Sequence, residues 1–150
     1  MTLGEICKKD IVTADRETTV RDAAKLMREH HVGNVVVVDG KKPVGIVTDR
    51  DIVVGVLATG LDAEALTTGE IMGPGLTLGH VDDDVSTIVH RMSREGIRRM
   101  PVVGEGGELE GMFALDDYLR VLASQMHDVS RLIAREQKRE AETRLALSAR

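Results

Sequence analysis

The feature that most constrains this chain is an internal duplication. The stretch "TLGEIC" at residues 2–7 returns as "TTGEIM" at residues 67–72, a shift of 65 residues. The same shift relates several apolar residues: Val20 to Val85, Met27 to Met92, and Val37 and Val38 to Val102 and Val103. The shift becomes 66 after a loop, where Gly45 matches Gly111, and loops tolerate such insertions. We therefore expect two copies of one structural unit.

Each copy predicts a β-α-β-β-α unit. Helical stretches carry apolar residues three or four positions apart, at Val20, Ala23, Ala24 and Met27 and at Val85, Ile88, Val89 and Met92. Continuous apolar runs typical of buried strands follow, "NVVVVD" and "RMPVVG", and then the second strands "VGIVT" and "LEGMFA". Short extended pieces are expected at residues 11–13 and 76–78, and a helix closes each unit.

The expected fold class is therefore α/β (α+β), with two pseudo-symmetric repeats packed as one module and a C-terminal helical extension. We assign residues 1–60 to the first repeat, 61–124 to the second and 125–150 to the extension. A chain of 150 residues with 42% hydrophobic content can bury one core of domain size.

Composition excludes several classes of protein. A net charge of -5 disfavours a general nucleic-acid binder, and one Tyr and one Phe leave few platforms on which bases could stack. The single cysteine, Cys7, excludes an internal disulfide, and no apolar run has the length of a membrane span or resembles a secretory leader. We expect a cytoplasmic protein without a nucleic-acid or membrane partner.

The stretch "GIVTDRD" at residues 45–51 is the first candidate site. Thr48 stands at a helix start with Asp51 three positions on, the spacing of a capping box, in which each side chain satisfies a backbone N–H of the other residue. A carboxylate in this place can also accept both hydroxyls of a ribose, while the threonine hydroxyl and free N–H groups face a phosphate. The two roles are compatible.

The other repeat carries two arginines, Arg98 and Arg99, before its buried strand. The first repeat has Gly33 and Asn34 at the same place. If the two repeats pack face to face, the guanidinium groups approach Thr48 and its neighbours, and bidentate arginine suits phosphate. The alternative is that the arginines are solvated at the end of a strand, where they could pair with Asp117.

With its duplicated unit and the closing sequence "GIVTDRDI", the chain resembles a tandem pair of CBS domains over residues 2–123. In that family the hydroxyl and carboxylate of this signature bind the phosphate and ribose of an adenosine ligand, which implies those roles for Thr48 and Asp51. The basic pair often meets the phosphates, which implies that role for Arg98 and Arg99. The resemblance also implies an adenine lined by backbone near four residues, Thr77, Leu78, Met100 and Pro101.

The second signature, "GMFALDD", departs from the family pattern. Ala114 replaces the hydroxyl residue, and Gly33 and Asn34 replace the basic pair. The resemblance therefore implies a weaker second site around Thr13 and Asp117.

We expect a regulatory module and not an enzyme. The five histidines stand in no catalytic arrangement, and no phosphate-binding P-loop is present. The expected regulatory ligand is AMP, ADP, ATP or a related adenosyl compound, with no cofactor or metal required. The module is expected to form a homodimer and to act in trans on an unidentified protein.

Two alternatives stay open. One is a zinc site, in which Cys7 would join His30, His31 or His127. The other is a ligand-independent interaction module that uses apolar helix faces, formed by Val53, Val56 and Leu57 with Val121 and Leu122.

The extension divides into two halves. Met126, Val129, Leu132 and Ile133 keep helical spacing, and we expect them to pack on the core or on a partner chain. Residues 136–144 are almost all charged and are expected to project into solvent, with Leu145 and Leu147 near the tip. We expect the extension to contribute to dimer contacts or output and not to the nucleotide site.

Overall fold

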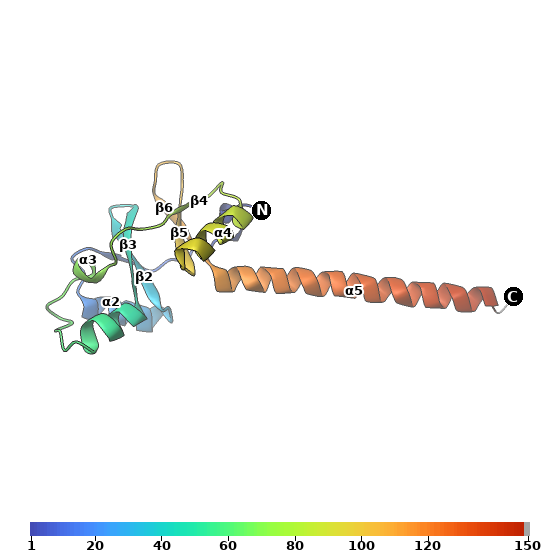
Figure 1. The fold of residues 1–150 in the computed structure, drawn as a ribbon, viewed down its shortest axis with the longest axis horizontal. Coiled ribbons are helices and arrows are strands. Elements are labelled where there is room, and N and C mark those ends of the chain that lie inside the picture. The colour runs from blue at the N-terminus through green and yellow to red at the C-terminus, as the bar shows by residue number, and fades with distance from the viewer. Residues whose placement is uncertain (149–150) are drawn as a thin grey trace. The chain divides into compact units, whose positions relative to one another are not determined.

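The computed structural model describes residues 1–148 and divides into two compact units, one covering Met1–Ala114 and one beginning at Leu115. The elements of the first unit (Figure 1) are α1 (Leu3–Ile6), β1 (Thr13–Asp15), α2 (Val20–His30), β2 (Asn34–Asp39), β3 (Lys42–Thr48), η1 (Asp51–Leu57), α3 (Thr68–Ile71), β4 (Gly79–His80), α4 (Val85–Glu95), β5 (Arg99–Val103) and β6 (Leu109–Ala114). The second unit is one helix, α5 (Leu115–Ser148).

Two small sheets repeat one topology. In the order β1-β2-β3, the first pair is parallel and the second antiparallel, and β4-β5-β6 follows the same pattern. Even the irregularity is repeated, because the antiparallel register shifts between Val37 and Val38 and again between Val102 and Val103. The duplication and the mixed α/β fold are thus confirmed.

Each long helix of the first unit starts and stops at a residue suited to that task. The hydroxyl of Thr19 accepts the Asp22 N–H ahead of α2, and the carboxylate of Asp84 accepts backbone N–H groups ahead of α4. Both helices end in a left-handed residue, His31 and Gly96. The predicted apolar faces are confirmed, since Val20, Ala23 and Met27 are buried, as are Val85, Ile88 and Met92.

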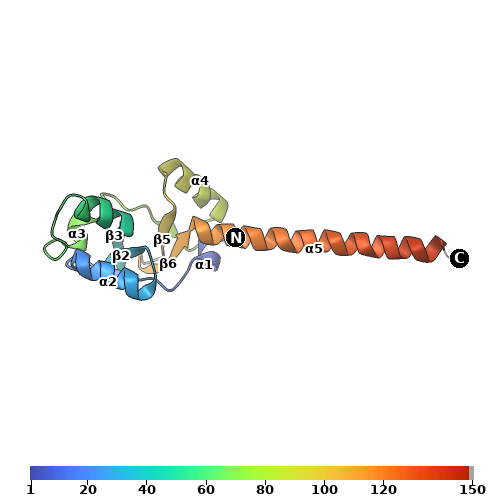
Figure 2. The ribbon, with the colours of Figure 1, turned by 90° about the horizontal axis from the view of Figure 1, so that it is seen from below.

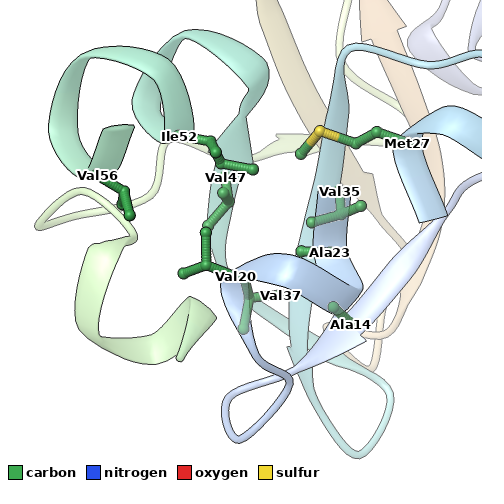
Figure 3. Packing of buried hydrophobic residues seen from close by; sticks show 9 residues of the cluster. All are labelled: Ala14, Val20, Ala23, Met27, Val35, Val37, Val47, Ile52 and Val56. Atoms are coloured by element: carbon green, nitrogen blue, oxygen red, sulfur yellow. The ribbon is translucent and has the colours of Figure 1, made fainter. Parts of the chain in front are cut away.

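The core of the first repeat joins helix, sheet and closing helix. Figure 3 shows side chains from α2, β2, β3 and η1 gathered in one cluster. Val20, Val35, Val37 and Val47 are fully buried. Valine-rich strands read as continuous apolar runs because side chains on both of their faces are covered.

The short helix at the start of each repeat packs against the other repeat. The N–H groups of Leu3 and Gly4 in α1 donate to the carbonyls of Asp83 and Val81 in the second repeat, at 3.0 and 2.8 Å. In α3, Thr68 donates in the same way to Thr18 of the first repeat. Figure 2 shows α1 beside β6 and α3 beside the first sheet. The repeats are therefore interlocked and form one module.

Two local expectations need correction, the start of the first strands and the exposure of Val56. The first strands begin at Thr13 and Gly79, later than residues 11 and 76, because pairing with Val36 and Val102 selects the strand residues. The closing helix η1 is a π-helix, in which the Ala58 N–H reaches the carbonyl of Val53, five residues back. Val56 of this helix is buried, so it is not part of an exposed apolar face.

The C-terminal extension is helical, as predicted. Helix α5 runs without a break through the last helix of the second repeat and the predicted extension. Met126, Val129, Leu132 and Ile133 are all exposed in the single chain, and their packing on the core or on a partner chain stays a prediction. Residues 149 and 150 of the predicted extension lie outside the described residues. No helix within residues 1–148 is both long enough and apolar enough to cross a membrane.

Candidate functional site

The predicted capping box at the start of η1 is present. The backbone N–H and the hydroxyl of Thr48 each donate to Oδ2 of Asp51 at 2.8 Å, and the Asp51 N–H donates back to the Thr48 hydroxyl at 3.2 Å. Both residues are half-buried. Both donors of Thr48 thus meet Oδ2 of Asp51, and Oδ1 takes no part in the capping box.

Strand alternation links Thr48 to a cleft between the repeats. Side chains two positions apart in a strand lie on the same face, so Thr48 and Ile46 share a face of β3 while Val47 points into the core. Ile46 lines a cleft together with Thr77 and Arg99 of the second repeat. Its remaining lining comes from the loop before β4 and from the turn before β5, at Gly73, Gly75, Leu76 and Ile97.

Thr77 is held by α4. Its hydroxyl donates to the carboxylate of Glu95, whose other oxygen accepts Nε of Arg91 at 3.0 Å. Arg91 also donates to the carbonyl of Leu78 at 3.1 Å. The Thr77 hydroxyl, followed by Arg91, holds the pKa of Glu95 below its ordinary value. The stretch at residues 77–78 is therefore fixed against α4.

The other residues expected near the adenine do not line the cleft. The side chain of Met100 is fully buried, and Pro101 is also buried within β5. Neither residue lines the cleft, and neither does Leu78. Arg98 is exposed in the turn before β5, next to Arg99 at the first position of the strand.

Asp51 opens onto a second, separate hollow. Arg50, Val54 and Gly55 line it from the η1 side, and Glu70 and Ile71 line it from α3. Thr77 and Arg99 thus meet Ile46 in the cleft, on the face of β3 that also carries Thr48. Asp51, three residues after Thr48, lines the other hollow.

The two residues of the expected second site are described separately. Thr13 is exposed at the start of β1, and Asp117 lies in the first turn of α5, where it accepts Nη1 of Arg120 at 3.1 Å. That these two residues form one site stays a prediction.

The residues of the alternative zinc site differ in burial. Cys7 is buried, whereas His30 and His31 are exposed at the end of α2. Over residues 1–148, no group of three or more His, Cys, Asp or Glu side chains is gathered closely enough to hold a metal ion.

The sequence did not predict several residues that line the cleft. Ile46, Leu76 and Ile97 are apolar residues without a chemical signature, and they enter the cleft only through the pairing of the repeats. Glu95 was missed as the partner of Thr77 because 18 residues separate them. The pair of glycines at 73 and 75 was a usable signal, since glycine allows a close approach of backbone to a ligand.

Comparison with known proteins agrees with the duplicated fold. The family model described as the CBS domain matches residues 3–57 and again residues 69–124. An uncharacterised protein of Methanopyrus kandleri is 34% identical over 122 residues, which make up 81% of this chain and 62% of that protein. The chain thus spans less than two thirds of that relative.

Solved structures share the fold. The structure of hypoxic response protein I with two coordinated zinc ions is 30% identical, has a TM-score of 0.72, and is matched over 80% of this chain and 98% of that one. A CBS domain protein of Pyrobaculum aerophilum complexed with AMP is 28% identical, has a TM-score of 0.70, and is matched over 78% and 89%.

Proposed function

This chain belongs to the CBS domain family, and from that premise we propose that it is a regulatory module that binds an adenosine nucleotide. The ligand class is AMP, ADP, ATP or a related adenosyl compound. Binding shifts the population of two conformations of the module, and the bound form acts in trans on a protein partner.

The cleft at Ile46 carries this proposal. It is lined from both repeats, by a strand residue of the closing signature of one and by Thr77 and Arg99 of the other. A guanidinium beside a hydroxyl and a glycine-bearing loop is a set of groups suited to phosphate. A ligand that spans such a cleft contacts both repeats and can therefore sense their relative position.

The proposed roles follow from the chemistry of each side chain. Arg99, helped by Arg98, binds phosphate in the cleft. Asp51 lines the separate hollow beside η1 and not the cleft, so the proposal requires the ribose to extend beyond the cleft to the Asp51 oxygen that does not cap η1. The cleft holds about 160 Å³, less than the roughly 300–1,000 Å³ typical of ligand pockets. A whole nucleotide would therefore also require the loop at Gly73 and Gly75 to move aside.

Homodimer formation is part of the proposal. Val53, Val54 and Leu57 project from η1 with 54%, 54% and 63% of their surface exposed. Adjacent exposed apolar residues on one short element mark an interaction surface more often than isolated ones do. We propose that a second copy covers this η1 face.

Calorimetric titration tests the ligand. The purified chain is titrated with AMP, ADP, ATP, adenosine and S-adenosylmethionine, and GMP serves as the control for the base. We expect at least one adenosyl compound to bind, mainly at one site per chain. Failure of every adenosyl compound to bind at millimolar concentration would overturn the proposal.

Zinc is the second candidate ligand, because the structure of hypoxic response protein I holds two coordinated zinc ions. The chain described here offers Cys7, His30, His31 and His127 but no gathered set of three ligands within residues 1–148. Elemental analysis of protein purified without metal-affinity steps is expected to find less zinc than one ion per chain. A full equivalent would favour zinc over the nucleotide.

A further inference from the structure

Helix α5 carries an apolar seam whose spacing is that of a coiled coil. Leu119, Leu122, Met126, Val129 and Ile133 follow one another at alternating intervals of three and four residues. We call these five residues the seam. Strict alternation of three and four is the a/d pattern of a heptad repeat, which predicts packing against another helix of the same period.

The seam is largely uncovered in a single chain. Leu119, Met126, Val129 and Ile133 are 55%, 74%, 57% and 50% exposed. A shallow groove runs along it and includes the small residues Ser130 and Ala134. Small residues beside a seam leave space for side chains of a facing helix. Most of the seam also lies beyond residue 124, where the family match ends.

We propose that the seam pairs with the seam of a second copy of this chain, as an antiparallel two-helix coiled coil centred on Ser124. In this register Leu122 faces Met126 of the second copy, and Leu119 faces Val129 of the second copy. Each seam residue then meets an apolar residue. Because the apolar residues of the seam pair with one another in this register, we assign a second copy of the chain as the partner helix.

The flanking positions favour the antiparallel arrangement. Residues just before each a position lie beside the seam. In this register Leu132 meets Tyr118 of the second copy. This contact gives a partner to Leu132, which is exposed in the single chain and is not part of the seam. At the centre, Gln125 meets Gln125 of the second copy, so two neutral side chains meet at the axis.

A parallel, in-register pair places like charges together instead. The heptad continues after Ile133 as Glu136 and Glu140, and each would face its own copy. Beside them, Arg139 would face Arg144 of the second copy. Like charges directly opposite one another are destabilising, whereas the antiparallel register leaves both glutamates beyond the paired seam.

Cross-linking in the full chain tests this arrangement directly. Cys7→Ala removes the native thiol, and Gln125→Cys or Glu136→Cys is added to that background. A short bismaleimide is expected to produce a covalent dimer with Gln125→Cys, because two copies of that position meet at the axis. With Glu136→Cys it is expected to give no more dimer than the background alone.

Matched variants connect the cross-link to the seam. Met126→Asp with Val129→Asp, added to Gln125→Cys, should lower the yield about tenfold or more, because a buried carboxylate is costly. Arg131→Asp puts a carboxylate on the opposite face of the helix and should keep the yield. Circular dichroism of each variant checks that the helix is intact.

The pattern of cross-links decides the outcome. Dimer from Glu136→Cys, with or without dimer from Gln125→Cys, would mean parallel pairing, and dimer from neither would mean that the seam is not paired; both results overturn the proposal. Mass alone does not decide, because contacts through the η1 face can also hold two copies together. The experiment contains no nucleotide, so its failure is distinguishable from failure of the proposed ligand.

Discussion

Cys7 packs directly on Gly111, so that its sulfur occupies the space that a side chain at that glycine would need. Met72 covers Gly45 in the same way. Cys7 and Met72 are equivalent in the duplication, as are the two glycines, and each contact joins one repeat to the other. The glycine that opens each closing signature is thus explained by packing between the repeats.

We predict that Gly111→Ala destabilises the protein. The added methyl group would meet Cys7 and, at 3.1 Å, the backbone carbonyl oxygen of Lys8, which cannot swing away. Overpacking of this kind costs about 1–3 kcal/mol of unfolding free energy. Urea denaturation measures it, with Gly55→Ala as the control, because nothing lies within 4 Å of a β-carbon there.

The contact itself can be isolated by a second substitution. Adding Cys7→Ala to Gly111→Ala removes the sulfur that clashes, so the double variant should be more stable than the sum of the single effects predicts. Strict additivity of the two substitutions would show that the strain does not arise between these residues.

What the sequence predicts well is local or repeated. The capping box of Thr48 and Asp51 depends on residues three apart, and the predicted helix faces depend on regular spacing. The role of Gly111 depends on Cys7, which lies more than a hundred residues away, and no local pattern contains that information. The lining of the cleft by Ile46 was missed for the same reason.

The two carboxylates of the closing signatures should differ in their effect on binding. Asp51→Ala is expected to weaken adenosine-nucleotide binding by about 1.5–3 kcal/mol, because a charged acceptor of ribose hydroxyls is lost. Asp117→Ala should cost less, since Ala114 supplies no hydroxyl beside it. Calorimetry measures both affinities.

Stability must be followed in parallel, because Asp51 also caps η1. Loss of such a cap costs about 0.5–2 kcal/mol of stability, so each titration is performed well below the unfolding temperature of the variant. Equal loss of affinity in two folded variants would contradict the proposed difference between the sites.

Arg99→Ala should weaken binding of AMP but spare adenosine. Its proposed partner is the phosphate, and a charge-assisted hydrogen bond to phosphate contributes about 1.5–3 kcal/mol. Arg98→Ala is expected to act in the same direction but more weakly, because only Arg99 lines the cleft. If either variant lost affinity for adenosine and AMP alike, the substituted arginine would not be a ligand of the phosphate.

Glu95 is expected to titrate below the ordinary range of a glutamate. Its hydrogen bonds from Thr77 and then Arg91 favour the ionised form, so its pKa is lowered in the folded state. The stabilisation from these contacts is therefore present above the unfolded-state pKa and is lost as pH falls through the folded-state pKa. Thr77→Val should raise the pKa of Glu95, as measured by NMR titration, and Ser93→Ala on the same helix is the control. An unchanged pKa in Thr77→Val would show that this hydrogen bond does not persist in solution.

Deletion of residues 136–150 should separate the end of α5 from the nucleotide site. Within the described part of this segment every side chain is exposed, and neither the cleft at Ile46 nor the hollow at Asp51 includes any of it. Surface changes remote from a site usually alter free energies by no more than about 0.5 kcal/mol, and we expect nucleotide affinity to stay within that range. The deletion also leaves the whole seam in place, so the shortened chain should still cross-link through Gln125→Cys. Calorimetry on a deletion variant that still cross-links measures the affinity, and a large loss there would mean that the end of the helix contributes to the ligand site.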